Sequence, residues 1–370
     1  MSADRVYFIA EAGVNHNGSL PLALDMIDVA ADAGADAVKF QSAIPEEVVS
    51  VHAPKARYQI ASTGDAGSQL DMVRKLHFGA NRTEAHRELA ARAAKRNIDL
   101  LSTPFDVESL HFLIDDIGLR TIKIASGDLT YSPLLLAAAR ANCNIILSTG
   151  MATLEEIEAA LGVIAFGYLN TGNTVGSNGF RAAYSDQRGR TVLRQRVTLL
   201  HCVTAYPAPI EQTNLRAMDT LAQSFGMRAG FSDHSLGTTM AIAAVARGAA
   251  IVEKHFSLDR SLPGPDHAAS LEPKELTALI ADIRALERGL GTGVKEPQSC
   301  ELENIDVARR SLVARRAIRR GEEFSEENLA AKRPTGGVSP MRYWDLIGTD
   351  ASRDYGTDEA ISDLTSNDRS

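Results

Sequence analysis

VYFIAEAG at residues 6–13 is the first of eight short apolar runs that recur along this 370-residue chain. The runs are rich in Val, Ile, Leu and Phe, which is typical of strands buried on both faces, as in parallel sheets. Helical patterns separate the runs, and a strand–helix unit repeated eight times predicts a (β/α)8 TIM barrel, with a doubly wound sheet as the alternative. The other seven runs are AVKFQ (37–41), DLLSTPF (99–105), TIKIAS (121–126), NIILSTG (144–150), TLLHCVT (198–204), AGFSDH (229–234) and IVEKHF (251–256).

Composition limits the classes of protein that the chain can be. The hydrophobic content of 44% supports a large core, and the formal net charge of −8 argues against a nucleic-acid partner. No segment approaches the ~18 apolar residues of a membrane span, and the N-terminus has no apolar signal-peptide region. Three widely spaced cysteines, Cys143, Cys202 and Cys300, indicate reduced, buried thiols. We therefore expect a cytoplasmic protein without a membrane partner.

Two segments interrupt the alternation of strands and helices. Residues 42–69 form a long polar excursion, which predicts a lid or rim loop. Residues 167–191 are rich in Gly, Asn and Ser without clear periodicity, which indicates a mobile insertion. Helices are expected at 20–33, 83–96, 106–116, 132–141, 153–166, 216–225, 238–248 and 273–289.

The chain changes character after residue 293. Residues 1–293 hold the barrel pattern, and the polar segment 294–307 reads as a linker. Residues 308–362 contain short β-like runs and turn signals, which predict a small β-rich module. We expect residues 363–370 to form a disordered tail. The length of 370 residues suits one large domain and one small domain.

Lysines and hydroxyl groups lie at or near the ends of the predicted strands. The carboxyl ends of barrel strands meet on one face, where such enzymes hold their active sites. Lys39 and Lys123 would suit a ligand that carries phosphate and carboxylate, or they could form ion pairs with neighbouring acids. Ser126 and Ser232 could donate to a phosphate, although serines often end strands.

His234 and His255 end two strands that we expect to be adjacent, about 4.8 Å apart. Their imidazoles could converge on a divalent ion that keeps several waters, or they could be hydrogen-bonded rim histidines. Glu11 lies near the predicted mouth of the barrel, where a carboxylate could transfer protons. In the alternative interpretation, the segment that follows Glu11 only forms a turn. Tyr206 and Asp266 could contact a sugar. Alternatively, Tyr206 could be an aromatic residue packed in its loop, and Asp266 could begin a turn.

Together these segments closely resemble the sialic acid synthase family, which condenses phosphoenolpyruvate with an N-acylated amino sugar. The resemblance covers nearly the whole chain in order, and the C-terminal module, with AKRP at 331–334, resembles an antifreeze-like (SAF) domain. The matching segments are IAEAGVNHNG, DAVKFQ, STPFD, KIASGD, LSTGMA, HCVTAYPAP, GFSDHSLG, VEKHFSLDR and GPDH.

The resemblance implies a role for individual residues of this chain. It implies catalytic roles for Glu11, Lys39, Lys123 and Tyr206, and metal ligation, usually of manganese with Mg²⁺ or Co²⁺ as alternatives, by His234 and His255. It implies substrate binding by Gln41, Thr103, Ser126, Asp128, Thr204, Ser232, Asp266 and Arg333. The family pattern also implies a domain-swapped homodimer in which Arg333 reaches the barrel of the partner.

The sequence departs from the family pattern at places that bear on the substrate. Thr204 and Asp128 stand where some members have Asn and Glu. N-acetylmannosamine, giving N-acetylneuraminate, is the first expectation for the acceptor, and a 2,4-diacetamido-6-deoxy sugar leading to legionaminic or pseudaminic acid is the alternative. Two other hypotheses stay open: a related synthase that uses a phosphorylated sugar, which would need a second basic pocket, and a non-catalytic carbohydrate-binding protein.

Overall fold

The structure is a computed structural model that describes residues 5–56, 59–60, 63, 67–170, 172 and 174–362. The chain forms two compact units that divide after Thr292, beside the boundary expected at residue 293. The predicted disordered tail at 363–370 lies outside the described residues.

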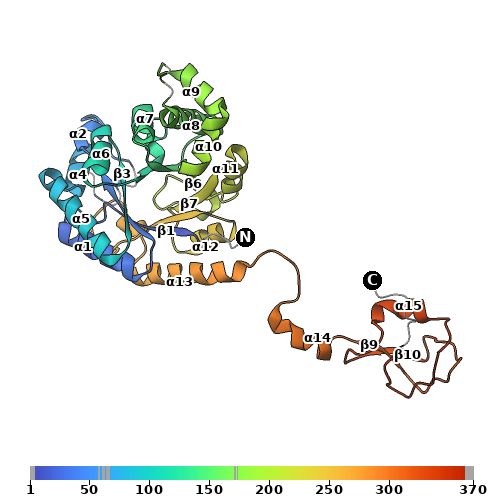
Figure 1. Cartoon of the computed structure of the whole chain (residues 1–370). Helices are drawn as coiled ribbons and strands as arrows, with labels where there is room; N and C mark the ends of the chain where they lie inside the picture. Colours follow the sequence, from blue (N-terminus) through green and yellow to red (C-terminus); the bar gives the residue numbers. More distant parts are fainter. Residues whose placement is uncertain are drawn as a thin grey trace. The chain divides into compact units, whose positions relative to one another are not determined.

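Eight parallel strands form the inner layer of the first unit (Figure 1). Their order in the sheet is β3-β2-β1-β8-β7-β6-β5-β4, and β3 contacts β4, which closes the barrel. The predicted (β/α)8 barrel is therefore confirmed. The strands are β1 (Tyr7–Gly13), β2 (Ala37–Ser42), β3 (Asp99–Pro104), β4 (Thr121–Ile124), β5 (Asn144–Ser148), β6 (Val197–Cys202), β7 (Arg228–Asp233) and β8 (Ile251–His255).

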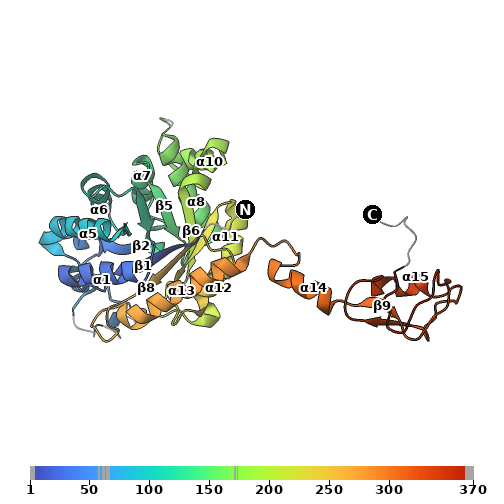
Figure 2. The same ribbon diagram turned by 60° about the horizontal axis from the view of Figure 1, so that its bottom comes forward.

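Helices cover the outside of the barrel (Figure 2). They are α1 (Leu20–Asp32), α2 (Pro45–Val48), α4 (Gln69–Leu76), α5 (Arg82–Arg96), α6 (Val107–His111), α7 (Ser132–Arg140), α8 (Leu154–Leu169), α9 (Ser177–Ser185), α10 (Gln187–Arg196), α11 (Ala217–Phe225), α12 (Thr239–Ala246) and α13 (Pro273–Leu290). Ser19 caps α1 by accepting from the Leu22 N–H, and Met26 and Ile27 lie on its buried face. Among the described residues, no helix is both long enough and apolar enough to cross a membrane.

The inside of the barrel is divided along the strand direction. An apolar cluster packs the barrel interior and excludes water from it; its members are Ile9, Ala37, Leu101, Ile146, Leu200 and Ile251. Residues further along the same strands are polar, beginning with Glu11 two positions after Ile9 and Glu253 two positions after Ile251. Because side chains alternate between the two faces of a strand, these carboxylates face inward above the apolar cluster.

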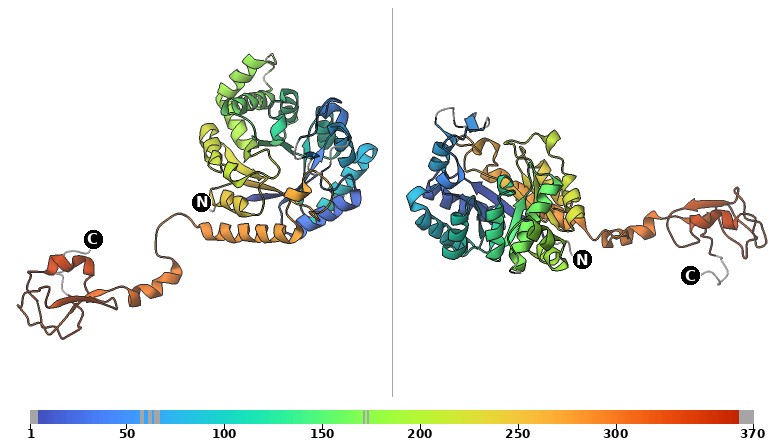
Figure 3. Two further views of the ribbon diagram at one scale, coloured as in Figure 1. Left: turned by 180° about the vertical axis from the view of Figure 1, so that it is seen from behind. Right: turned by 90° about the horizontal axis from the view of Figure 1, so that it is seen from above.

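The two predicted interruptions contain regular structure. Segment 42–69 includes α2; its residues 57–58, 61–62 and 64–66 are not among the described residues. The insertion at 167–191 contains the end of α8, all of α9 and the first half of α10, so its prediction as a segment without regular structure was wrong; residues 171 and 173 are not described. In Figure 3 the green helices α8 and α9 lie together. Phe180 of α9 packs edge-to-face on Phe166 of α8 at 5.3 Å, and Leu193 of α10 is buried. A few well-placed apolar residues therefore order a segment that is otherwise polar.

The second unit is small and mostly β. Strands β9 (Ser311–Ala314) and β10 (Leu329–Lys332) pair antiparallel, and α15 (Tyr343–Leu346) follows. Its core is made of Leu312, Ala314, Ile318, Phe324, Leu329, Leu346, Ala351, Tyr355 and Ile361. The polar segment predicted as a linker holds helix α14 (Leu302–Ala308), so its reach is shorter than that of an extended chain. Cys143 and Cys202 are buried as expected, whereas Cys300 is exposed.

Candidate active site

A cavity of about 380 Å³ opens at the carboxyl ends of the barrel strands. Every predicted site residue of the first unit lines it: Glu11, Lys39, Gln41, Thr103, Lys123, Ser126, Asp128, Thr204, Tyr206, Ser232, His234, His255 and Asp266. Arg333 lies in the second unit directly after β10, where its side chain is exposed. The structure thus gathers residues from seven strands and their following loops into one site.

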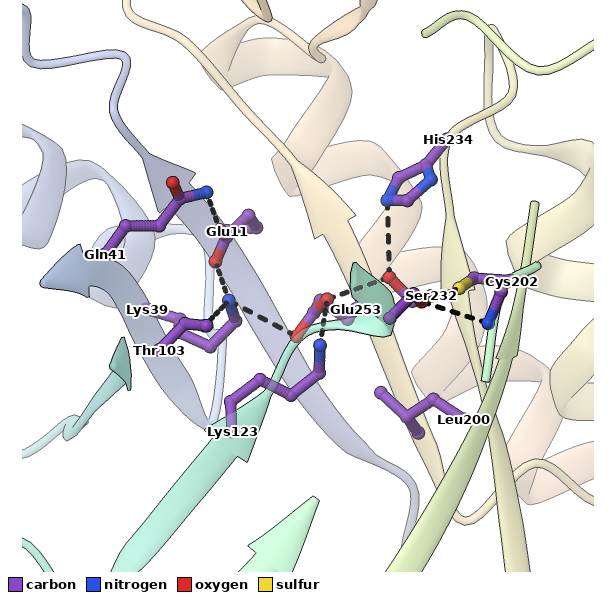
Figure 4. A network of polar contacts seen from close by, with 12 residues as sticks. Glu11, Lys39, Gln41, Thr103, Lys123, Leu200, Cys202, Ser232, His234 and Glu253 are labelled. Atoms are coloured by element: carbon purple, nitrogen blue, oxygen red, sulfur yellow. Dashed lines mark hydrogen bonds and ion pairs between the residues drawn. The ribbon is translucent and has the colours of Figure 1, made fainter. Parts of the chain in front are cut away.

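Glu253 is the centre of a buried network of charges in this cavity (Figure 4). Its carboxylate lies 3.7 Å from the Lys39 ammonium and 3.5 Å from the Lys123 ammonium, and it accepts a 2.8 Å hydrogen bond from Ser232 Oγ. Lys39 Nζ lies 2.7 Å from Glu11 Oε2 and donates to Thr103 Oγ1 at 2.8 Å. These side chains come from β1, β2, β3, β4, β7 and β8, so the network exists only when the barrel is closed.

The network places two carboxylates in unequal surroundings. Burial opposes ionisation of Glu253, but Lys123 and Lys39 outweigh it and hold the pKa of Glu253 below its usual range. Burial raises the pKa of Glu11, and the nearby charge of Glu253 adds to that effect against the opposing influence of Lys39. Two such carboxylates can differ in protonation at neutral pH, which is the arrangement that proton transfer requires.

A second group of polar atoms surrounds Ser126, two residues after the end of β4. Its hydroxyl accepts from the Gly150 N–H at 2.9 Å and lies 3.0 Å from Cys202 Sγ. A Cβ at position 150 would lie 2.4 Å from Thr204 Oγ1, so a side chain there would displace the site. Ser148 Oγ is buried on the same side and has no hydrogen-bond partner among the described residues. Small hydroxyl groups and a glycine backbone therefore pack closely on this part of the cavity, where only a residue without a side chain fits at position 150.

His234 and His255 follow adjacent parallel strands, as predicted, with ring centroids 5.5 Å apart. His234 Nδ1 donates to the Val203 carbonyl at 2.8 Å, which leaves Nε2 with its lone pair. Burial lowers the pKa of His234 to about 4 and that of His255 well below its usual value, so both rings are neutral. The Tyr206 ring lies 4.2 Å from the His234 ring.

These two imidazoles fit a divalent metal ion. His255 Nδ1 is buried in the cavity and has no hydrogen-bond partner in the part of the chain that the structure describes. Neutral imidazole with a free lone pair is the form that ligates metals. No cluster of three or more His, Cys, Asp and Glu ligands occurs among the described residues, so water and substrate oxygens would complete the coordination.

Two further acids of the cavity are held toward their neutral forms. Burial raises the pKa of Asp128 to about 7, and its Oδ2 has no hydrogen-bond partner within the described ranges. Burial also raises the pKa of Asp266 to about 6. Near neutral pH these carboxyl groups can donate hydrogen bonds to a sugar as well as accept them.

Sequence reasoning gave no role to three residues of this site. Glu253 is one of the polar groups near the strand ends, in the run IVEKHF, and alternation places it on the same face as His255, which was sufficient to assign it to the site. Ser148 could have been found in the same way, at the end of β5. His77 reaches the cavity from beyond the end of α4, and no strand pattern predicts it.

Fold and site together define a class: a (β/α)8 barrel enzyme whose mouth holds a buried network of lysines and carboxylates beside two neutral histidines. The NeuB family model matches residues 26–295 and the SAF domain model matches residues 309–363. The chain belongs to the NeuB family and carries a C-terminal SAF domain.

The similarity to known proteins extends over nearly the full length of this chain. The N,N'-diacetyllegionaminic acid synthase of Campylobacter jejuni is 46% identical to this chain, and the match covers 96% of this chain and 99% of the synthase. The N,N'-diacetyllegionaminic acid synthase of Legionella pneumophila is 38% identical, and the match covers 93% of this chain and 89% of the synthase. A crystal structure of N-acetylneuraminic acid synthetase from Leptospira borgpetersenii is 37% identical with a TM-score of 0.64, covering 82% of this chain and 91% of that one.

Proposed function

We propose that this protein condenses phosphoenolpyruvate with a 2,4-diacetamido-6-deoxyhexose to give a nine-carbon 2-keto acid of the legionaminic acid type and inorganic phosphate. The observation that carries the proposal is the pair Lys39 and Lys123 in one buried cavity with Ser148 and His255, whose polar atoms lack partners among the described residues. Buried polar groups are normally satisfied, so unpartnered ones gathered in one cavity indicate a missing polar ligand.

Each end of phosphoenolpyruvate finds complementary groups. Lys123, Ser126 and Ser232 suit its phosphate, because an ammonium and two hydroxyls make charge-assisted hydrogen bonds. Lys39 and Thr103, already joined at 2.8 Å, suit its carboxylate. Held in this way, the C3 carbon faces the remainder of the cavity, where Gln41, Tyr206 and Asp266 would orient the open-chain sugar.

The reaction balances as a condensation with hydrolysis. A bond forms between C3 of phosphoenolpyruvate and the aldehyde carbon, the C=O π bond breaks, and the aldehyde oxygen takes up a proton to become a hydroxyl. Positive character develops at C2, where water adds and releases a proton that balances the one taken up. The C–O bond to phosphate then breaks, which leaves the keto acid. In this proposal Glu11 and Glu253, each paired with a lysine, would stabilise the cationic C2 or take the proton from water, and the two lysines would balance the charge of the departing phosphate.

His234 and His255 would hold a divalent ion, for which Mn²⁺ is our proposal and Mg²⁺ or Co²⁺ the alternatives. A bound ion of this kind polarises an aldehyde oxygen as a Lewis acid. Tyr206, whose ring lies tilted against that of His234 at 4.2 Å, and the Val203 carbonyl would fix the orientation of that imidazole.

Similarity to the two legionaminic acid synthases favours the diacetamido acceptor over N-acetylmannosamine, which the sequence alone placed first. Pseudaminic acid synthesis from the corresponding isomer is the second candidate. An assay of phosphate release with phosphoenolpyruvate tests the proposal against the other classes. Release with an unphosphorylated acceptor supports it, release only with a phosphorylated sugar indicates the related synthases, and no release with any acceptor would indicate a carbohydrate-binding protein.

For assembly we propose a domain-swapped homodimer in which exposed Arg333 of the second unit contacts the sugar in the partner's barrel. Closed two-fold symmetry permits such an exchange. Mixing Arg333→Ala with Lys123→Ala protein, each of which we expect to have reduced turnover, under subunit exchange should give more activity than either variant alone. Heterodimers that form without such a gain in activity would show that Arg333 does not act across an interface.

A further inference from the structure

Part of the cavity lining is apolar, in contrast to the charged network around Glu253. We call Val14, Val49, Met72 and Leu76 the apolar wall; each lines the cavity and is at most 8% exposed. Val14 directly follows β1, Val49 directly follows α2, and the other two belong to α4. Val14, Met72 and Leu76 pack on one another as a small hydrophobic cluster, separate from the two large cores of the barrel.

Local sequence explains why α4 presents this face. Ser68 and Asp71 form a reciprocal capping box that starts the helix, and Met72 and Leu76 are four residues apart, on one side. Arg74 of α4 pairs with Glu46 of α2 at 2.7 Å, which ties together the two helices that carry the wall. The wall is therefore a held surface rather than a loose loop.

His77, directly after Leu76, adds one polar atom on this side of the cavity. Its Nδ1 lies 2.9 Å from the Val73 carbonyl, which can only accept, so Nδ1 carries the proton and Nε2 is an acceptor. Nε2 is buried and has no hydrogen-bond partner among the described residues. Burial lowers the pKa of His77, which keeps the ring neutral. Gln69 at the start of α4 also lines the cavity, but His77 directly adjoins Leu76 of the wall. An unpartnered acceptor beside apolar side chains is complementary to an amide N–H attached to a methyl-bearing group.

The position of the wall relative to the charges decides which part of the acceptor it meets. If phosphoenolpyruvate occupies the lysine end, the sugar aldehyde faces that end and the distal carbons of the sugar face away from it. Hydroxyls against an apolar wall would lose their hydrogen bonds to water, whereas methyl groups would gain from burial. A 2,4-diacetamido-6-deoxy sugar carries an acetamido group at C4 and a methyl group at C6, where N-acetylmannosamine carries hydroxyls.

We propose that the apolar wall and His77 form the subsite that selects the acceptor, with His77 Nε2 accepting from the C4 acetamido N–H and Met72, Leu76 and Val14 packing its methyl and the C6 methyl. This inference rests on the proposed function, because it assumes which end of the cavity binds phosphoenolpyruvate. Specificity then arises on α4, whereas the charged network serves the substrate common to the family.

The test compares full-length Met72→Gln and His77→Phe with wild type, using steady-state kinetics for each substrate and synthetic 2,4-diacetamido-6-deoxy acceptor. Gln has the length of Met but places an amide on the wall, and Phe keeps a ring but removes the acceptor. We expect kcat/KM for the acceptor to fall by about tenfold or more in each, while KM for phosphoenolpyruvate stays within twofold. Lys75→Ala, exposed on the same helix, is the matched control and should change neither value.

A fall of less than fivefold in both variants, or a parallel rise in KM for phosphoenolpyruvate, would overturn the subsite. Val14→Thr, nearly isosteric, replaces either variant that does not fold, and the same fivefold limit applies to it. Wild-type protein that turns over only N-acetylmannosamine would instead contradict the proposed function. Failure of the proposed subsite would therefore be seen in the variants, and failure of the proposed function would be seen in the wild-type protein.

Discussion

Glu253 and Lys254 are neighbours on β8, and both are buried, but their charges serve different ends. Lys254 faces away from the barrel interior, where its ammonium lies 2.8 Å from Asp233 and contacts the Ser235 carbonyl, and Ser235 donates twice to the same carboxylate. Glu253 faces the cavity between two lysines at 3.5 and 3.7 Å. The outer pair is compact and fully bonded, whereas the inner network is looser. A complete ion pair stabilises the fold, and an incomplete one leaves interactions for a ligand.

Metal removal should have the largest effect on the inner region. We expect EDTA to abolish turnover and Mn²⁺ to restore it, because His234 and His255 have lone pairs directed to the cavity. His255→Ala should lose Mn²⁺ binding measured by titration calorimetry as well as activity. Full activity of metal-stripped protein, or of His255→Ala, would contradict the metal site.

Breaking the outer pair should have the largest effect on stability. Lys254→Met leaves the Asp233 carboxylate buried without its ammonium, which should cost about 3–5 kcal/mol in the free energy of unfolding. Lys123→Met should cost less than half as much, since Glu253 keeps Lys39 and Ser232. Urea unfolding of the two variants measures the difference. Equal losses would show that the inner and outer charges have the same role.

His86 is a buried histidine outside the charged network, and the fold holds it in its neutral form. Burial lowers the pKa of His86 to about 4, and Ser42 lies 2.8 Å from its Nε2. A histidine whose folded pKa is depressed gives stability that is present above pH 6.5 and lost as the pH falls through about 4. The loss should approach about 3 kcal/mol for His86. Urea midpoints between pH 7 and 4 should fall less steeply in His86→Gln, and parallel curves would contradict this assignment.

Lys123→Ala should have the smallest effect in energy but a selective one. Losing one charge-assisted contact should weaken the binding of phosphoenolpyruvate by about 1.5–3 kcal/mol, which is one to two decades in affinity. The binding of the sugar should change far less. Steady-state KM values for both substrates measure this selectivity. Unchanged KM and kcat/KM for phosphoenolpyruvate would remove Lys123 from the binding site.

The sequence predicted the barrel and most of its site because both follow from short-range patterns. Buried strands of a parallel barrel are continuous apolar runs, and their polar ends meet on one face whatever the connecting helices do. The insertion at 167–191 was missed because its order depends on Phe180 meeting Phe166 of another helix, a contact that no local pattern reveals. His77 and the wall residues Val49, Met72 and Leu76 were missed for the same reason, since the path of the segment between β2 and β3 places them at the cavity.

The most direct test of the central claim is a competition in one vessel. Purified full-length protein with Mn²⁺ and phosphoenolpyruvate receives equal amounts of the 2,4-diacetamido-6-deoxy acceptor and N-acetylmannosamine, and products are identified by mass spectrometry while phosphate is measured. We expect one phosphate released per nine-carbon keto acid formed, with the diacetamido product predominating. Phosphate release without a keto acid, or a product formed mainly from N-acetylmannosamine, would contradict the account.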